Sequence, residues 1–271
     1  MNWKQLISAK RFGMEEFHEE RQENRSEFQR DYDRLIFSAP FRRLQNKTQV
    51  FPLPGSVFVH NRLTHSLEVA SVGRSLGDDV AKALLERHPE LQDSFLPEIG
   101  SIVSAACLAH DLGNPPFGHS GEKAISTFFS EGKGVRLKEK QPNGEQLSPM
   151  EWEDLTHFEG NANAFRILTH QFEGRRKGGF VLTYTTLASI VKYPFSSSLA
   201  GTKSKFGFFI SEEESFQKIA TELGLTLLNE HPLKYARHPL VYLVEAADDI
   251  CYQMMDIEDA YKLKILTTEE T

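Results

Sequence analysis

Two histidines and two aspartates lie where helical spacing predicts inward-facing positions. His65 falls on the apolar face of one predicted helix, and His110 ends the apolar run of the next, with Asp111 directly after it. In a late helix Asp248 shares the apolar face, whereas Asp249 points to the polar side. Because a buried carboxylate is unfavourable unless it is paired or bound to a cation, this set indicates a divalent metal site with nitrogen and oxygen ligands. For each residue taken singly, a hydrogen-bonded core histidine or a capping aspartate is the alternative.

Helices must position these side chains, since apolar residues recur mostly at helical spacing and few segments alternate as strands do. The sequence therefore predicts an all-α, mostly helical bundle with little or no β-structure. Surface loops are expected at 131–150 and 194–209, which are rich in small, polar and charged residues. Helices are expected at about 63–86, from Pro97 to His110-Asp111, and at about 121–130, 151–172, 212–222 and 238–263.

The composition is that of an ordinary folded protein, with 271 residues, 39% apolar and 25% charged. A formal net charge of −7 argues against binding polyanions by bulk electrostatics, but leaves room for a phosphate substrate held by a metal ion. Cys107 and Cys251 fall in apolar helical patterns and are expected to be buried free thiols in a reducing compartment. Since we find neither a secretory signal nor eighteen consecutive apolar residues, we expect a cytoplasmic protein without membrane partners.

Four segments surround the candidate ligands with more specific patterns than a His-Asp doublet alone provides. They read RLTHSLEV at 62–69, HDLGNPPFGHSGE at 110–122, FEGN at 158–161 and EAADDICY at 245–252. Together they resemble the deoxyguanosine triphosphate triphosphohydrolase (dGTPase) family of HD-domain phosphohydrolases over nearly the whole chain. The resemblance implies an HD-domain helical bundle in which an N-terminal helical segment, 1–60, packs on a core formed by 61–271. It also implies that the family's C-terminal helices are missing from this sequence, which ends at Thr271.

The same resemblance implies a reaction, the hydrolysis of deoxynucleoside triphosphates (dGTP or dNTPs in general) to a deoxynucleoside and tripolyphosphate. By this likeness His65, His110, Asp111 and Asp248 would bind one divalent metal ion. Mn, Fe, Co, Ni and Zn all suit such a donor set, and Mg would accompany the nucleotide. The ion would polarise an α-phosphate oxygen and lower the pKa of the attacking water.

His119 and Glu122 are three residues apart, so they share a face if a helix begins there. The resemblance places this pair near the scissile bond, with His119 in proton transfer or leaving-oxygen stabilisation and Glu122 orienting it. A histidine that merely caps the helix is the alternative. Substrate contacts implied by the resemblance, each with a solvated or packing role as its alternative, are Gln49, Arg62, Lys192, Tyr193, Tyr252 and Asp256.

Three of these contacts have specific implied roles. Gln49 would reach the deoxyribose 3′-hydroxyl, and Tyr252 would stack below the sugar and leave no room for a 2′-hydroxyl. Arg62 is the leading candidate for the triphosphate, and the weaker candidates are Lys192, Tyr193, Lys203 and Lys205.

The same family likeness implies that the protein forms a homo-oligomer, either a hexamer or a tetramer. An effector nucleotide or single-stranded DNA is a further candidate partner. The basic runs at 42–43 and 175–177 would suit such a ligand, or would form a solvated surface.

Two other functions stay open on sequence alone. One is an inactive regulatory module that binds a nucleotide or single-stranded DNA. The other is a different HD-type nucleotide phosphohydrolase, a monophosphatase or phosphodiesterase, whose second metal ion would need extra histidine ligands. The histidines available between the doublet and Asp248 are His119, His157, His170, His231 and His238.

Overall fold

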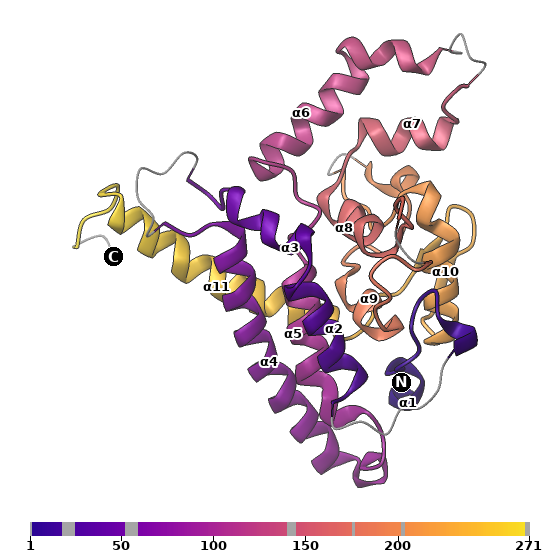
Figure 1. Ribbon diagram of the computed structural model, residues 1–271, viewed down its shortest axis with the longest axis vertical. Coiled ribbons are helices and arrows are strands. Elements are labelled where there is room, and N and C mark those ends of the chain that lie inside the picture. The colour runs from indigo at the N-terminus through magenta and orange to yellow at the C-terminus, as the bar shows by residue number, and fades with distance from the viewer. Residues whose placement is uncertain are drawn as a thin grey trace.

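The computed structural model describes residues 2–17, 25–51, 59–139, 145–174, 177–201 and 204–268. Arg175, Arg176 and Lys203 lie outside these residues. The α-helices are α1 (Trp3–Leu6), α2 (Glu27–Ile36), α3 (Ala39–Arg43), α4 (Arg62–Arg87), α5 (Ile99–Ala109), α6 (Gly118–Ser130), α7 (Pro149–Thr156), α8 (Gly160–Thr169), α9 (Tyr184–Ile190), α10 (Glu213–Glu222) and α11 (Val241–Lys262) (Figure 1).

Short 3₁₀ helices connect several of these elements, and the described strands form one small hairpin. The 3₁₀ helices are η1 (Glu15–Phe17), η2 (Leu44–Asn46), η3 (Pro89–Leu91), η4 (Leu96–Glu98), η5 (Lys133–Lys138), η6 (Ser197–Leu199) and η8 (Ile210–Glu212). Strand β1 (Leu227–Asn229) pairs antiparallel with β2 (Lys234–Tyr235). The prediction of an all-α fold is therefore confirmed.

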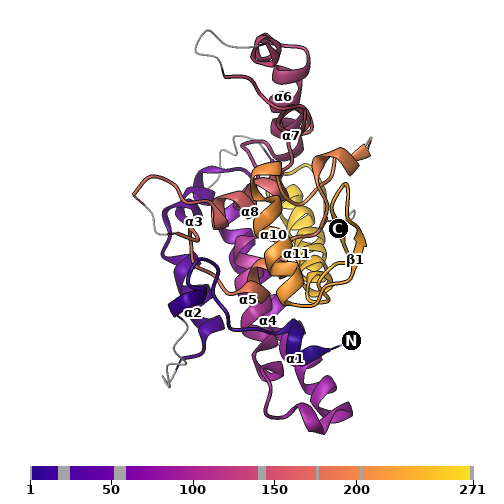
Figure 2. The ribbon, with the colours of Figure 1, turned by 90° about the vertical axis from the view of Figure 1, so that its right-hand side faces the viewer.

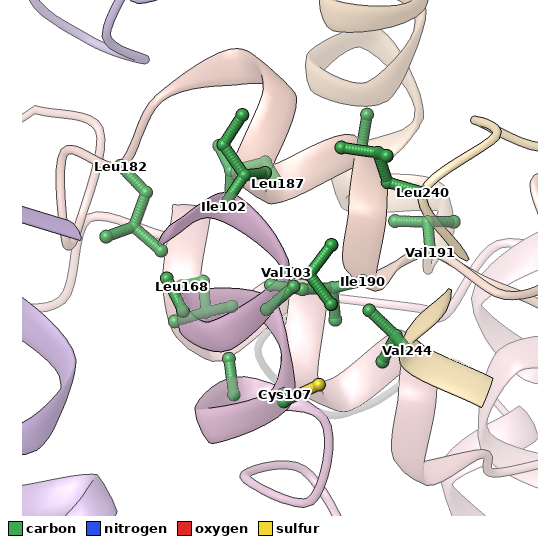
Figure 3. Close-up of a cluster of buried hydrophobic side chains, with 14 of the residues drawn as sticks. Ile102, Val103, Cys107, Leu168, Leu182, Leu187, Ile190, Val191, Leu240 and Val244 are labelled. Atoms are coloured by element: carbon green, nitrogen blue, oxygen red, sulfur yellow. The ribbon is translucent and has the colours of Figure 1, made fainter. Parts of the chain in front are cut away.

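Helix α5 is the centre of the fold because it is apolar on all sides, as a fully buried helix must be. All of its residues except Ser101 are buried, and it packs against α2, α4, α9 and α11. In Figure 3, Val103 of α5 lies in one cluster with Ile190 of α9 and Val244 of α11. This packing fixes the C-terminal end of α5, where His110 follows.

Glycines allow α4 to approach α5 closely. A Cβ atom added to Gly73 would lie 2.6 Å from Cys107 Sγ, and one added to Gly77 would lie 2.7 Å from Gly100 Cα. Because such distances leave no room for a side chain, any larger residue would push the two helices apart. Cys107 and Cys251 are buried and free, as expected.

Several predicted boundaries need correction. Helix α6 begins three residues before the predicted 121, which places His119 in its first turn and Glu122 one turn later in the same helix. The helical pattern predicted over 151–172 is two helices, because the Glu159 carboxylate accepts hydrogen bonds from Asn161 N and Ala162 N and starts α8 anew. The loops predicted at 131–150 and 194–209 contain 3₁₀ turns, η5 and η6.

The sequence did not predict α9 or the hairpin. All seven residues of α9 are buried, so this short helix lacks the solvent-exposed, charged face that makes a helical period easy to recognise. The hairpin strands are only three and two residues long, too short for alternation to stand out.

Two surfaces stand out at the periphery. Helices α6 and α7 project from the body of the molecule (Figure 2). Helix α11 and the turn after it carry a row of exposed apolar side chains, the α11 stripe, formed by Tyr242, Ile250, Met254, Ile257, Tyr261 and Ile265. Among the described helices, none combines the length and the apolar character needed to cross a bilayer.

Candidate metal centre and active site

The start of α4 is set by a capping box, which places His65 in the first turn. The Asn61 side chain accepts hydrogen bonds from Leu63 N and Thr64 N, while Thr64 Oγ1 accepts one from Asn61 N. The His65 ring is only 1% exposed, and its Nε2 lies 3.0 Å from Oδ1 of Asp248 on α11. The two helices thus meet through this pair.

His110 follows α5 and is oriented by that helix. Its Nδ1 lies 2.6 Å from the carbonyl oxygen of Cys107, which fixes the Nδ1–H tautomer and leaves Nε2 as the ring's acceptor. This Nε2 atom lies 3.6 Å from Asp248 Oδ1 and 3.7 Å from Asp111 Oδ1. The His65 and His110 rings meet edge to face, with centroids 5.3 Å apart.

The four side chains suit a cation. The ligating atoms of His65, His110 and Asp111 all lie within 4.8 Å of one another, and Asp248 touches both histidines. Within the described part of the chain, His110 Nε2 is buried without a hydrogen-bond partner. A buried acceptor aimed at two carboxylates, on an imidazole whose other nitrogen donates to a carbonyl, is the arrangement of a metal-binding histidine. Mixed imidazole and carboxylate donors fit a divalent transition metal.

The charges of these groups depend on one another. Burial opposes ionisation of Asp248, but nearby His110 and the hydrogen bond to His65 lower its pKa to about 2. Burial likewise opposes ionisation of Asp111, yet His110 and Arg62 lower the pKa of this carboxyl. The pKa of His110 is raised, because Asp111 and Asp248 outweigh the effect of burial. Both aspartates are therefore ionised and ready to bind a cation.

Arg62 is buried beside the cluster and pairs with one of its carboxylates. Its Nη1 atom lies 2.7 Å from Asp111 Oδ2. Gly118 allows this placement, since a Cβ atom there would lie 2.8 Å from Arg62 Nη2. Arg62 thus lines the same cleft as predicted, but it also holds Asp111 in place.

His119 and Glu122 lie on one face at the start of α6, as their spacing predicted. His119 Nδ1 is 2.8 Å from Glu122 Oε2, and the other carboxylate oxygen accepts a hydrogen bond from Gly160 N at 2.8 Å. The Glu122 side chain is 11% exposed, whereas that of His119 is 85% exposed. The hydrogen bond from Gly160 N therefore holds the Glu122 carboxylate in place, while the ring of His119 is exposed to solvent and lines the cleft.

A cleft of about 300 Å³ joins these two groups of residues. Lys192 and Tyr193 line it, with Lys192 Nζ 3.0 Å from Glu245 Oε1 and also over the Tyr193 ring. Gln49 and Tyr252 line it too. The predicted site residues that border the cleft are Gln49, Arg62, His65, His110, Asp111, His119, Glu122, Lys192, Tyr193, Asp248 and Tyr252.

Asp256 is not brought to this cleft. It lies one turn beyond Tyr252 on α11 and does not line the cleft, although the charge of His65 affects its ionisation, as do Asp259 and His60. His60 Nδ1 is 2.8 Å from Asp259 Oδ1, so this group forms a separate polar contact between α11 and the segment before α4. Burial raises the pKa of Asp256.

Sequence reasoning gave no role to Asn114 and Glu159 in the cleft and ranked Lys205 low. Lys205, only a weak candidate before, lies 2.8 Å from Glu159 and 3.7 Å from Glu122. The Asn114 side chain donates a hydrogen bond to Asp111 Oδ1. Asn114 and Glu159 stand inside the quoted motifs, which was the signal available, whereas Lys205 is distant from its partners in sequence.

Of the five intervening histidines, only His119 lines the cleft, and its ring pairs with Glu122. His157 lies beside Glu153 and His238 is buried against the Leu6 carbonyl. His170 and His231 also lie outside the cleft, and among described residues the one cluster of metal-ligating type is His65, His110 and Asp111.

The fold and this cluster agree with the comparison against known families. Residues 62–177 match the HD domain, a span that includes His65, His110 and Asp111. This part of the chain is thus similar to the HD domain, and the match includes the doublet that follows α5.

More specific relatives cover the whole chain. It is 45% identical, over 98% of its length, to a deoxyguanosinetriphosphate triphosphohydrolase-like protein of Synechocystis sp.. It is 46% identical over its full length to a protein of the same name from Pseudomonas aeruginosa, and 36% identical to the deoxyguanosinetriphosphate triphosphohydrolase of Yersinia enterocolitica. The chain spans 61%, 59% and 57% of the lengths of these three relatives. It is related to this dGTPase group of HD-domain proteins.

Proposed function

We propose that this protein hydrolyses deoxynucleoside triphosphates, dGTP or dNTPs in general, to a deoxynucleoside and tripolyphosphate with one divalent metal ion. The observation that carries the proposal is the cluster of two histidines and two aspartates in a cleft that His119 and Glu122 also line. The names of the relatives support the choice of substrate.

In this proposal His65, His110, Asp111 and Asp248 hold the ion. When bound, the ion would polarise an α-phosphate oxygen and lower the pKa of a water molecule. Mn, Fe, Co, Ni and Zn all remain suitable, with Mg bound to the nucleotide. Arg62 keeps the Asp111 carboxylate oriented through its 2.7 Å contact.

His119 acts on the leaving group. As water attacks the α-phosphorus, the bond from phosphorus to the 5′-oxygen breaks, and His119 Nε2 gives its proton to that oxygen. Glu122 accepts from Nδ1 at 2.8 Å and so stabilises the protonated ring. Because the Glu122 carboxylate is anchored by Gly160 N, the ring is held in one orientation.

The cleft needs cations for such a substrate. Its described lining holds five carboxylates, Asp111, Glu122, Glu159, Glu245 and Asp248, against three permanent cations, Arg62, Lys192 and Lys205. A triphosphate would be repelled by this balance unless a divalent ion offsets it. Lys192 and Lys205, with Tyr193, are the residues we assign to the phosphates.

Sugar selection is assigned to Gln49 and Tyr252. The Oε1 atom of Gln49 is buried with no partner among the residues described, so it is free to accept a hydrogen bond from a 3′-hydroxyl. Tyr252, half exposed one turn after Asp248, would pack below the sugar and leave no room for a 2′-hydroxyl. We also place the protein in the cytoplasm, in keeping with its two free thiols.

Product analysis tests this proposal. Protein loaded with Mn²⁺ is incubated with each of the four dNTPs, and phosphorus NMR and chromatography identify the products. Tripolyphosphate and a deoxynucleoside are expected, with GTP hydrolysed far more slowly than dGTP. Orthophosphate or pyrophosphate as the only product would point to a different HD-type phosphohydrolase. DNA or nucleotide binding without any turnover would point to a regulatory module instead.

A further inference from the structure

A second cavity, of about 400 Å³, lies beside the turn that carries the His110-Asp111 doublet. Leu112 lines it, whereas His110 and Asp111 line the cleft, and the two linings share no described residue. Helix α3, the end of α8 and the segment that follows α8 form its walls. It is therefore separate from the proposed active site.

The walls of this second cavity are largely apolar and partly aromatic. Leu112, Ile167 and Phe180 contribute to them. Phe172 is 46% exposed, and its ring meets that of His170 edge to face with centroids 4.7 Å apart. An exposed phenyl face beside aliphatic side chains is suited to stacking against a flat ring.

The cations of the second cavity lack acidic partners. Lys47 Nζ donates hydrogen bonds to the carbonyls of Asn114, at 2.7 Å, and Leu112, at 3.4 Å, and in the described chain neither Lys47 nor Arg43 has a carboxylate within 4 Å. Burial, together with the positive charges of Arg62 and Arg43, lowers the pKa of Lys47, although the charge of Asp111 opposes this shift.

No described carboxylate lines the second cavity, in contrast to the five in the cleft. His170 is the lining residue closest to an acid, with Nδ1 3.9 Å from Glu212, which itself pairs with Arg166. An excess of positive charge beside apolar walls favours an anion with an apolar part.

We propose that this cavity binds a small anion that carries a flat ring, with the ring against Phe172 and the anionic group at Arg43 and Lys47. Aryl phosphates and nucleoside monophosphates share this chemistry. Charge-assisted hydrogen bonds from the two cations would hold the phosphate, and stacking would hold the ring. Binding here is independent of any hydrolysis in the cleft.

Calorimetric titration of the whole chain without added divalent metal tests the proposal, with phenyl phosphate as the probe. Inorganic phosphate has the anionic group without the ring, and phenol has the ring without the anionic group. Each is expected to bind at least about tenfold more weakly than phenyl phosphate. AMP is titrated in parallel as the model of a nucleoside monophosphate. Whichever of AMP and phenyl phosphate binds more tightly is the better model of the natural ligand.

Variants locate the bound probe. Arg43→Ala and Phe172→Ala are each expected to weaken phenyl phosphate binding about tenfold. Arg42→Ala and Phe37→Ala are matched controls, because Arg42 and Phe37 are exposed and do not line the cavity. Unchanged thermal unfolding of all four variants shows that they are folded.

Lys192→Ala changes a residue of the cleft, so it distinguishes binding in the cleft from binding in the second cavity. We expect it to leave the affinity for phenyl phosphate unchanged. Loss of binding in Lys192→Ala together with full binding in Arg43→Ala and Phe172→Ala would overturn the proposal. Absence of any binding at millimolar phenyl phosphate would overturn it as well.

Discussion

At the scale of single residues, His119 differs from the metal cluster in exposure. His65 is buried and touches Asp248, whereas His119 is 85% exposed and touches Glu122. A group that is to reach a substrate atom must be accessible, and a ligand that only holds an ion need not be. This contrast underlies the separation of metal binding from proton transfer in the proposed mechanism.

His119→Ala is expected to keep the metal ion and to lose turnover by about 10²–10⁴-fold, the usual contribution of a general acid. Metal content by elemental analysis and dNTP hydrolysis measured on the same sample provide the test. His157→Ala removes a histidine that does not line the cleft and is expected to change neither quantity. If His119→Ala loses its metal, the separation of roles is wrong.

Much of the centre could be predicted because helical periodicity reports burial directly. The inward position of His65 and the outward position of Asp249 follow from their spacing to apolar neighbours, and both are observed. The Arg62–Asp111 pair could not be predicted in this way, since its members are 49 residues apart. Contacts of this kind depend on how helices pack, which local spacing does not specify.

At the scale of elements, a buried acid joins α7 to the segment before α10. Asp154 Oδ2 accepts a hydrogen bond from Ile210 N at 2.7 Å, and the carboxyl group is buried. Burial, with the nearby charges of Glu212 and Glu151, raises the pKa of Asp154 to about 6 despite the hydrogen bond from Ile210 N.

This pKa predicts a pH-dependent effect of Asp154→Asn. Between pH 4 and pH 6 the folded state holds the Asp154 proton more tightly than the unfolded state, so this group makes the wild type less stable as the pH rises. Asp154→Asn has no carboxyl group to titrate at this position. Its free energy of unfolding, relative to that of the wild type, should therefore increase by about 2 kcal/mol from pH 4 to pH 6. Urea unfolding at pH 4, 5, 6 and 7 measures the difference.

Asp249→Asn makes the same chemical change on an exposed side chain and serves as the control. A difference between wild type and Asp154→Asn that stays constant over pH would refute the assigned ionisation.

Elements with two distinct faces were predicted well, and elements without them were not. Helix α4 extends over Arg62–Arg87, close to the predicted 63–86, because its apolar positions recur on one side. Helix α9 is buried on all sides and so lacks the exposed, charged face that makes a period easy to recognise. The division between α7 and α8 depends on a single capping side chain, Glu159, inside an otherwise helical pattern.

At the scale of the whole molecule, the α11 stripe leaves a row of large apolar side chains in water. Met254, on the helix that also supplies Asp248, is 71% exposed, and Ile265, just beyond the end of that helix, is 59% exposed. Apolar patches of this kind mark surfaces that associate. The chain as given is therefore expected to self-associate, in line with the homo-oligomer implied by its family likeness.

Met254→Lys combined with Ile257→Lys should reduce this association while changing stability by no more than about 0.5 kcal/mol. Sedimentation velocity over a range of protein concentrations measures the effect. Leu228→Lys, an equally exposed apolar residue on β1, is the matched control and should leave association unchanged. A wild-type chain that stays monomeric at every concentration would contradict the expectation.

The metal stoichiometry of reconstituted protein tests the central claim most directly. After loading with Mn²⁺ and removal of free ion, elemental analysis should find one ion per chain in the wild type and in His119→Ala. Almost none should remain in His110→Ala, since this change removes the ligand whose Nε2 faces both aspartates. No bound ion in the wild type, two per chain, or one retained by His110→Ala would contradict a single centre built from His65, His110, Asp111 and Asp248.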